Sequence, residues 1–182
     1  MRKMFEKPRD IMLYQERTEE QEFGRAKKAY RICSKCRAVY FTKSWHHIDA
    51  IDVAKIKKRS TLWVTRCPAC QMIADHQYEG ALTIKDIPKK FADELLHLIK
   101  AFSKRAYEKN CQHRLIAVTK ESQDAWTVTT TENQLASKLA KKIKDVFDRV
   151  ELKVAYSKQP DDVERILVRF KPYLSLTPNK KH

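Results

Sequence analysis

The sequence predicts an α+β protein in which a small cysteine-bearing ribbon precedes a sheet covered by two helices. Two observations carry this prediction. Two Cys-x-x-Cys pairs stand beside short β-branched and aromatic runs, and the second half of the chain alternates helical with strand-like apolar spacing. We therefore divide the chain into an N-terminal arm (1–30), a zinc ribbon (31–85), an αββαββ domain (86–171) and a C-terminal tail (172–182).

Composition narrows the class of function. Among 182 residues, 38 Lys and Arg stand against 23 Asp and Glu, which gives a net charge of +15. Nucleic acid is the commonest polyanion that such a charge attracts. Two glycines are too few for a Gly-rich phosphate loop or a dinucleotide fingerprint. The chain shows neither an apolar run near the ~20 residues of a membrane span nor a secretory signal, so we expect a cytoplasmic protein with no membrane partner.

The four paired cysteines predict a metal site. Cys33 and Cys36 form one pair and Cys67 and Cys70 the other, so two tight turns can aim four thiolates at one ion. We interpret the site as structural Zn²⁺, because four thiolates leave no open coordination position. An iron–sulfur cluster uses the same four ligands and remains an alternative to zinc. Disulfide bonds are typical of exported proteins, and a thioredoxin-type redox pair requires a surrounding βαβ pattern, so neither is expected here.

The ribbon is predicted from the residues around these pairs. β-branched and aromatic residues over Ala38–Thr42 and Thr61–Thr65 favour strands that leave the first pair and enter the second. A short helix is expected over His46–Arg59. His46 and His47 are interpreted as solvated or RNA-facing, since the four thiolates already complete the site. The preceding arm is highly charged, and either a short helix or a segment that orders on a partner fits its composition.

The first half of the αββαββ domain is predicted from apolar spacing. Pro88 suits the first turn of a helix that ends near Asn110. The buried face of this helix recurs at three- and four-residue steps and comprises Phe91, Leu95, Leu98, Ile99, Phe102 and Ala106. Arg114–Lys120 and Asp124–Thr130 follow as two strands joined by a polar turn.

The second half repeats this order. Thr131 is the expected N-cap of a helix that ends near Asp148. The buried face of this second helix comprises Leu135, Leu139, Ile143, Val146 and Phe147. Apolar alternation then predicts strands over 150–156 and 166–170, with a turn at Pro160–Asp162. Four strands with two helices on one face would bury both apolar faces and leave the other side of the sheet free for a partner.

Five segments also carry a family resemblance. They are Cys33-Ser-Lys-Cys-Arg-Ala-Val-Tyr40, Lys43-Ser-Trp45, Cys67-Pro-Ala-Cys-Gln71, Gly80-Ala-Leu-Thr83 and Trp126-Thr-Val-Thr-Thr-Thr131. Over roughly residues 30–170 the chain resembles a family of small bacterial zinc-ribbon proteins. More remotely, it is similar to the zinc-bearing N-terminal part of the archaeal and eukaryotic export adaptors of the large ribosomal subunit.

The resemblance implies a zinc head, an α+β body and a link to ribosomes or RNA. The four paired cysteines would be the zinc ligands. The first pair departs from the family pattern, because it lacks the usual proline and has Arg37 where such knuckles usually have glycine. A left-handed turn at Arg37 would be mildly strained.

A nucleic-acid interface is predicted on the ribbon. Cations would bind phosphates, and an exposed tryptophan would stack on an unpaired base, whereas Trp63 and Tyr40 can instead fill the ribbon core. The candidate interface residues are Arg31, Lys35, Arg37, Lys43, Trp45, Lys57, Lys58, Arg59 and Arg66. We expect an RNA-binding protein that acts at the ribosome, with ribosomal RNA and ribosomal proteins as partners and no small-molecule substrate.

Two other functions fit the same residues. One is a regulator that binds DNA or RNA polymerase, and the other is a protein-interaction adaptor. A catalytic function is not predicted. Cys111 and His113 form a close Cys/His pair outside the two knuckles, but no helix N-terminus or second cation is evident to create a thiolate there.

Overall fold

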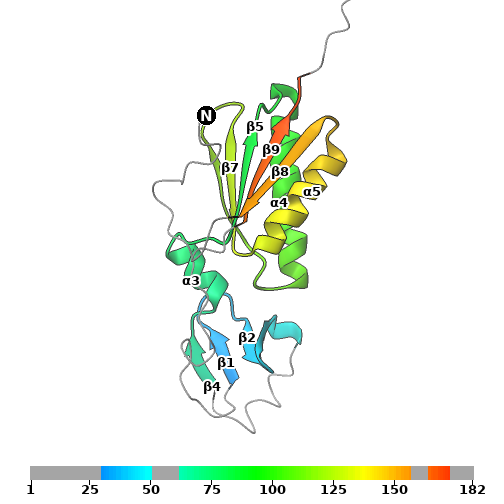
Figure 1. The fold of residues 1–182 in the computed structure, drawn as a ribbon. Helices are drawn as coiled ribbons and strands as arrows, with labels where there is room; N and C mark the ends of the chain where they lie inside the picture. Colours follow the sequence, from blue (N-terminus) through cyan, green and yellow to red (C-terminus); the bar gives the residue numbers. More distant parts are fainter. Residues whose placement is uncertain (1–29, 51–61, 157–163, 173–182) are drawn as a thin grey trace, which may run out of the picture.

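The structure is a computed structural model that describes residues 30–50, 62–156 and 164–172 (Figure 1). Within these residues the chain is α+β, as predicted, and its elements form two bodies. We call the part from β1 to α3 the ribbon and the part from β5 to β9 the sheet body. The predicted arm, most of the predicted tail, much of the helix expected after His46 and the turn at Pro160 lie outside the described residues.

The ribbon is built on a four-stranded sheet with the order β3-β2-β1-β4. Its strands are β1 (Tyr30–Cys33), β2 (Val39–Phe41), β3 (Ser44–His46) and β4 (Leu62–Thr65). Thr42 and Lys43 join β2 to β3 as a two-residue hairpin, and both have positive φ values, 48° and 64°, as the tightest hairpin turns require. The short helices of the ribbon are η1 (Ile48–Ala50) and α3 (Pro68–Ala74).

The sheet body is a mixed five-stranded sheet with the order β6-β7-β5-β9-β8. Its strands are β5 (Gly80–Lys85), β6 (Leu115–Lys120), β7 (Trp126–Thr130), β8 (Val150–Tyr156) and β9 (Glu164–Phe170). Its helices are η2 (Lys89–Phe91), α4 (Ala92–Lys109) and α5 (Asn133–Val146). The αββαββ order is therefore present, and the additional strand β5 precedes it in the chain and lies at the centre of the sheet.

That additional strand corrects two expectations. The prediction of a four-stranded sheet is wrong, and Gly80–Lys85, which the sequence analysis placed in the ribbon, is the central strand β5. β5 pairs parallel to β9 and antiparallel to β7. β5 has a short alternation, with Leu82 and Ile84 buried and Thr83 and Lys85 partly exposed, but this pattern does not show which sheet the strand joins.

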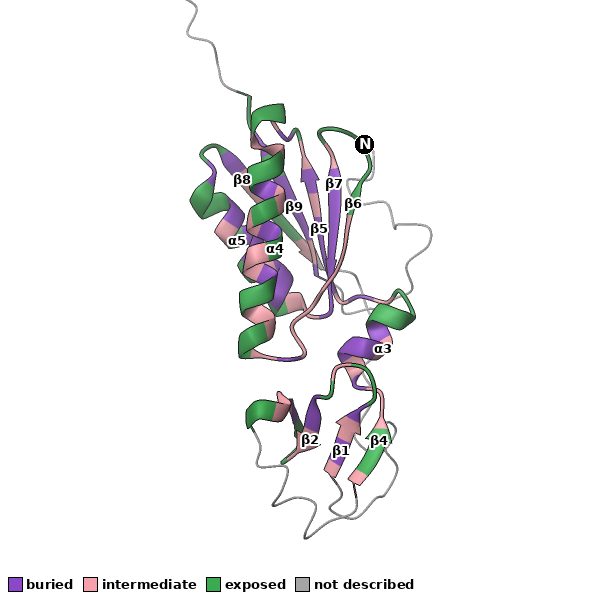
Figure 2. Ribbon diagram, turned by 180° about the vertical axis from the view of Figure 1, so that it is seen from behind, coloured by how far each residue is buried: buried purple, intermediate pink, exposed green. Residues whose placement is uncertain are grey.

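Helices α4 and α5 lie side by side over one face of the sheet (Figures 1 and 2). The core of the sheet body lies between these layers, and its members include Leu82, Ile84, Leu95, Ile99, Trp126, Val128, Leu139, Ile143, Phe147, Ile166, Val168 and Phe170. The predicted buried faces of both helices are confirmed in their main positions, since Leu95, Ile99, Leu139 and Ile143 are fully buried. Val146 is an exception, because it is 41% exposed at the last residue of α5.

The start of α5 differs from the prediction. Glu132, not Thr131, occupies the N-cap position, and it makes no side-chain capping bond. The Thr131 hydroxyl instead donates to the backbone oxygen of Gln112 at 2.6 Å and accepts from the backbone N–H of Arg114 at 2.9 Å. Thr131 therefore fixes the loop before β6 rather than the first turn of α5.

The face of the sheet opposite the helices is less open than predicted. Thr127, Thr129 and Leu167 alternate with core residues, so they point to this second face. All three are less than a tenth exposed, and Tyr78 forms a small buried cluster with Ala81 on the same side. The centre of this face is therefore covered and is not a free docking surface.

Candidate metal centre

Strand pairing explains how the two cysteine pairs meet. β1 and β4 are parallel neighbours, and Cys33 at the end of β1 stands opposite Thr65 at the end of β4. The chain then turns at the same edge of the sheet after both strands. The backbone N–H of Ser34 donates to the Thr65 oxygen at 2.7 Å and ties the two turns together. Cys67 follows β4 by two residues and is the N-cap residue of α3.

Each pair is held in a tight turn. In the first turn, the backbone N–H of Cys33 donates to the Ala38 oxygen at 2.8 Å, and that of Arg37 donates to the Cys33 oxygen at 3.0 Å. Arg37 has a φ of 62°, which confirms the left-handed residue expected there. In the second turn, Pro68 opens α3 and places Cys70 in its first turn.

The four sulfurs converge. The Sγ atoms of Cys33, Cys36, Cys67 and Cys70 all lie within 4.8 Å of one another, and those of Cys36 and Cys67 are 3.6 Å apart. All four cysteines are free thiols. Four sulfurs around a tetrahedral Zn²⁺ are separated by about 3.8 Å, given Zn–S bonds of about 2.3 Å. The donor set therefore fits a closed tetrathiolate site, and iron-based centres use the same donors.

The crowded sulfurs compete for protons. Hydrogen bonds from Cys67 and Cys70 lower the pKa of the Cys36 thiol far below its ordinary value. The same contact with Cys36 raises the pKa of Cys67 well above its ordinary value and raises that of Cys70 to about 11. One thiolate is thus stabilised by its protonated neighbours. A divalent cation bound by these sulfurs would favour the ionised form of every one of them.

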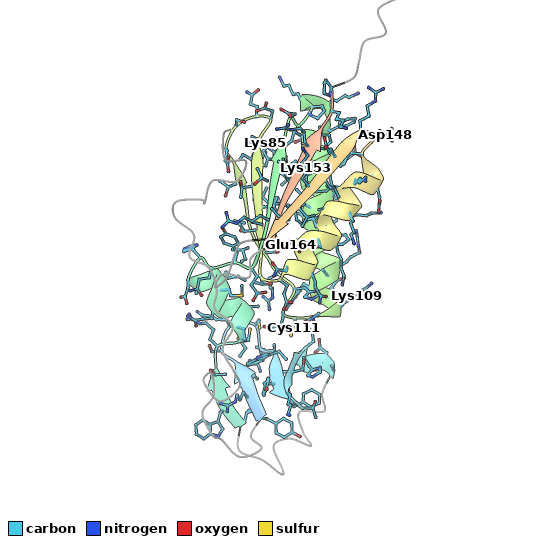
Figure 3. All side chains as sticks on the ribbon, in the orientation of Figure 1. Lys85, Lys109, Cys111, Asp148, Lys153 and Glu164 are labelled. Atoms are coloured by element: carbon cyan, nitrogen blue, oxygen red, sulfur yellow. The ribbon has the colours of Figure 1, made fainter. Side chains whose placement is uncertain are left out.

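The sheet body closes one side of this centre. Cys111, only 1% exposed, belongs to the same buried cluster as the paired cysteines, and Tyr107 packs against it. Figure 3 shows Cys111 at the junction of the ribbon and the sheet body. Two polar contacts cross the junction. The backbone N–H of Ala69 donates to Gln112 Oε1 at 3.2 Å, and His47 Nε2 donates to the Tyr107 backbone oxygen at 2.6 Å. His47 is therefore a junction residue rather than the solvated or RNA-facing residue predicted.

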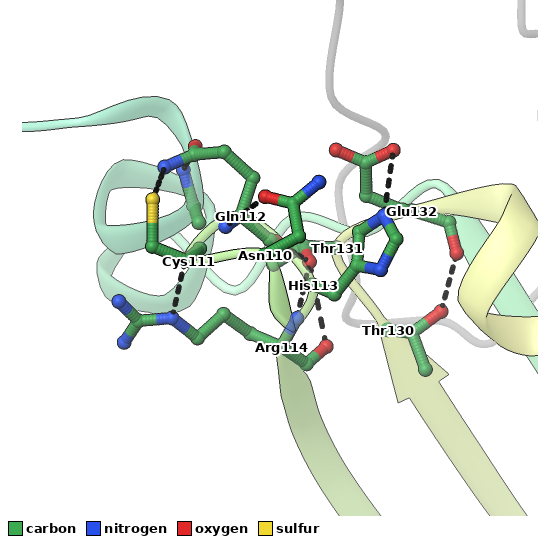
Figure 4. A network of polar contacts seen from close by, with 9 residues as sticks. Asn110, Cys111, Gln112, His113, Arg114, Thr130, Thr131 and Glu132 are labelled. Carbon is green, nitrogen blue, oxygen red and sulfur yellow. Dashed lines mark hydrogen bonds and ion pairs between the residues drawn. The ribbon is translucent and has the colours of Figure 1, made fainter. Parts of the chain in front are cut away.

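The loop between α4 and β6 supplies these junction residues (Figure 4). Cys111 Sγ accepts from Gln112 Nε2 at 3.5 Å, whereas His113 Nε2 lies 3.9 Å from a carboxylate oxygen of Glu132. Each residue of the Cys111–His113 pair thus has another partner. Burial raises the pKa of the Cys111 thiol, and burial together with the charge of Lys138 lowers the pKa of His113.

The tryptophan predicted to stack on a base is buried. Trp45 is 7% exposed, packs in the cysteine cluster, and has its ring 5.4 Å from that of Tyr40. Its position on β3 aims the indole at the sulfurs, so the prediction that Trp45 is a surface stacking residue is wrong. Trp63 on the outer strand β4 is 51% exposed instead, and its neighbour Val64 is 71% exposed.

The predicted cations of the ribbon fall into three groups. The exposed ones are Lys35, Arg37 and Lys43. Arg31 is only 9% exposed on β1, and Arg66 is half-buried with Nη1 3.5 Å from Gln71 Oε1, so neither lies fully open to a phosphate. The remaining three lie outside the described residues, and they are Lys57, Lys58 and Arg59.

Sequence reasoning missed the residues that the sheet body contributes to the centre. Tyr107 and Arg114 stand far along the chain from both cysteine pairs and belong to no local motif. Arg114 nevertheless places its guanidinium 4.2 Å from the Tyr107 ring, beside the cysteine cluster. The lone signal was Cys111, a fifth cysteine just after a predicted helix.

Comparison with known proteins does not assign the chain to a family. The chain matches no protein-family model and no curated protein. Among the described residues, no helix is long and apolar enough to cross a membrane.

Proposed function

We propose that this chain is a metal-stabilised RNA-binding protein that acts at the ribosome, with no catalytic step of its own. The zinc ribbon would be a rigid recognition element and the metal would be structural, since four thiolates leave no coordination position for a substrate. The net charge of +15 supplies long-range attraction to a polyanion. The distribution of this charge over the sheet body is the observation that carries the proposal.

Helix α5 presents a basic outer surface. It contains four lysines and one acidic residue, Asp145. Lys138, Lys141 and Lys144 follow one another at three-residue steps and are all exposed, whereas Leu135, Leu139 and Ile143 form the buried side of α5. Within the described part of the chain, none of the three forms an ion pair. Lysines without acidic partners are available to bind phosphates.

The ribbon adds two further elements of an RNA interface. Lys35 and Lys43 are exposed in its turns, and Trp63 offers an aromatic surface on the outer strand β4. Base stacking on an aromatic ring contributes about 1–3 kcal/mol per base.

The test compares two triple variants of equal charge. Lys138→Gln, Lys141→Gln and Lys144→Gln together remove the α5 surface. The matched control replaces three exposed lysines elsewhere on the sheet body, namely Lys89, Lys153 and Lys171, by Gln. Binding of a mixed-sequence single-stranded RNA is measured over a range of salt concentrations. We expect the α5 variant to lose affinity and to flatten the salt dependence by about 0.7 in log–log slope for each lost phosphate contact.

The control should keep the wild-type slope. If both triple variants lose affinity equally, RNA binding depends only on the net charge of the protein and α5 is not an interface. Sedimentation of the tagged wild-type protein through a sucrose gradient tests the ribosomal part, because it should migrate with ribosomal subunits. Copurification with genomic DNA instead would favour the DNA-binding regulator, and absence of any nucleic acid would favour the protein adaptor.

A further inference from the structure

Arg114 connects the sheet body to the metal centre. It stands at the end of the loop after α4, immediately before β6. Its backbone N–H donates to Thr131 Oγ1 at 2.9 Å, and its side-chain Nε donates to the backbone oxygen of Cys111 at 2.9 Å (Figure 4). The guanidinium carbon lies 4.2 Å from the centre of the Tyr107 ring. The side chain is thus held by two contacts, and a backbone hydrogen bond fixes the residue that carries it.

This orientation places the guanidinium beside the cysteine cluster, because Cys111 belongs to that cluster and Tyr107 packs against it. Burial alone works to lower the pKa of the Arg114 guanidinium, yet the negative charge of Cys36 and Cys70 raises it above its ordinary value. The Nη2 atom of Arg114 is buried and has no hydrogen-bond partner among the described residues. A buried donor of a charged group is costly unless an acceptor compensates for it.

A buried tetrathiolate centre is stabilised by a nearby cation. Zn²⁺ with four thiolates carries two net negative charges, and burying them is unfavourable without hydrogen bonds or positive charge nearby. Cys33 Sγ accepts one backbone hydrogen bond, from Cys67 N–H at 3.3 Å. Arg114 comes from the other body and combines a fixed guanidinium with an uncompensated donor.

We propose that Arg114 is the counter-cation of the metal-bound thiolates, so that metal binding in the ribbon also attaches the ribbon to the sheet body. Arg114 is a positioning residue in this role and not a metal ligand. Metal binding increases the negative charge that faces the guanidinium, and the resulting attraction reinforces the contacts of His47 with Tyr107 and of Ala69 with Gln112 across the junction. The proposal concerns the metal centre and is independent of RNA binding.

The experiment measures Zn²⁺ affinity by competition with a chromophoric chelator. Arg114→Gln removes the cation and keeps a polar side chain. Arg105→Gln is the matched control, because Arg105 is an exposed arginine on the neighbouring helix α4 and the change in net charge is identical. We expect Arg114→Gln to bind Zn²⁺ about 10–100-fold more weakly than the control, as is typical when a partner of metal ligands is removed. Arg114→Lys keeps the charge without the planar fork and should lie between them.

A second readout separates this role from simple packing. Co²⁺ in a tetrathiolate site gives a thiolate-to-metal charge-transfer band, and removing a cation beside the sulfurs should shift that band in Arg114→Gln but not in Arg105→Gln. Amide hydrogen exchange at the junction should quicken in metal-loaded Arg114→Gln, while the core of the sheet body stays protected. The proposal is overturned if Arg114→Gln binds Zn²⁺ within twofold of the control with an unshifted Co²⁺ band. It is also overturned if Arg114→Lys binds no better than Arg114→Gln, or if the wild type binds no Zn²⁺.

Discussion

The ribbon and the sheet body bury different kinds of side chain. In the sheet body, large apolar residues from five strands and two helices fill one continuous core. In the ribbon, the buried cluster consists of cysteines and alanines around one tryptophan, Trp45. Apolar burial contributes about 25 cal/mol per Å², so the sheet body can be stabilised by packing, whereas a cluster of sulfur atoms and small side chains gains little in this way. The two bodies should therefore depend on different forces and should fail separately.

The largest difference in stability between the ribbon and the sheet body is expected for Cys67→Ser. Structural zinc contributes on the order of 10–16 kcal/mol to binding-coupled folding in small zinc-dependent peptides, so removing one ligand should unfold the ribbon. Elemental analysis should show loss of stoichiometric metal. Hydrogen exchange should show lost protection in β1–β4 and retained protection in β5–β9. Cys111→Ser serves as the control and should keep its metal, because Cys111 is not one of the four converging thiols. Simultaneous unfolding of both bodies would contradict the comparison.

Acid should affect the ribbon before the sheet body. The raised pKa values of Cys67 and Cys70 mean that these thiols hold protons at neutral pH until a metal displaces them. Metal binding then releases protons. The apparent affinity for Zn²⁺ should therefore fall about tenfold for each unit by which the pH is lowered and for each proton displaced. A chelator competition at several pH values measures this slope, and circular dichroism reports on the sheet body at the same pH. An affinity that does not change with pH would mean that the thiols are already ionised.

Gly80→Ala tests whether the sheet body can be destabilised without loss of metal from the ribbon. A Cβ at Gly80 would stand 2.7 Å from Ala136 Cβ and 2.8 Å from the backbone oxygen of Glu132, where α5 crosses β5. Such overpacking typically costs about 1–3 kcal/mol, and here it should lower the stability of the sheet body. Denaturant titration measures the loss. The zinc content should be unchanged, and a reduced zinc affinity of similar size would show that strain at Gly80 reaches the metal centre through the junction.

The smallest effect is expected for Arg37→Gly. The φ of 62° at Arg37 is left-handed, and a residue with a Cβ pays roughly 1 kcal/mol for it, which glycine avoids. Zinc release to a chelator should slow by a small factor, with no change in the sheet body. Arg37→Ala, which keeps the strain and removes the same charge, is the control. Equal release rates in the two variants would show that the turn is not strained at this position.

The sequence predicted the features that depend on local spacing. The convergence of the four thiols was predicted because two residues between cysteines suffice to describe a turn. The positions of α4 and α5 were predicted within a few residues because apolar steps of three and four persist over many residues. Arg37 was identified as strained for the same reason, since a single turn of known geometry contains it.

Features that depend on distant parts of the chain were missed. β5 was assigned to the wrong body because its short alternation predicts a strand but not its partners, and only pairing with the distant strands β7 and β9 places it in the sheet body. Trp45 was placed on the surface because the aromatic side chain of a short strand can point either way, and only the position of the sulfur cluster decides it. Arg114 had no local signal at all, because its contacts form only after the loop that follows α4 reaches the ribbon.

The parallel pairing of β5 with β9 has a consequence for the order in which the protein assembles. Gly80 stands opposite Glu164, so the central strand meets a neighbour that emerges from the ribosome last among the described strands. β1 and β4, with their cysteine turns, are already synthesised by then. Closing a long chain segment costs entropy before its contacts form, so long-range parallel pairing is slow. We therefore expect the ribbon to acquire its metal during translation, while β5 waits with β6 and β7 as a partial sheet until β9 completes it.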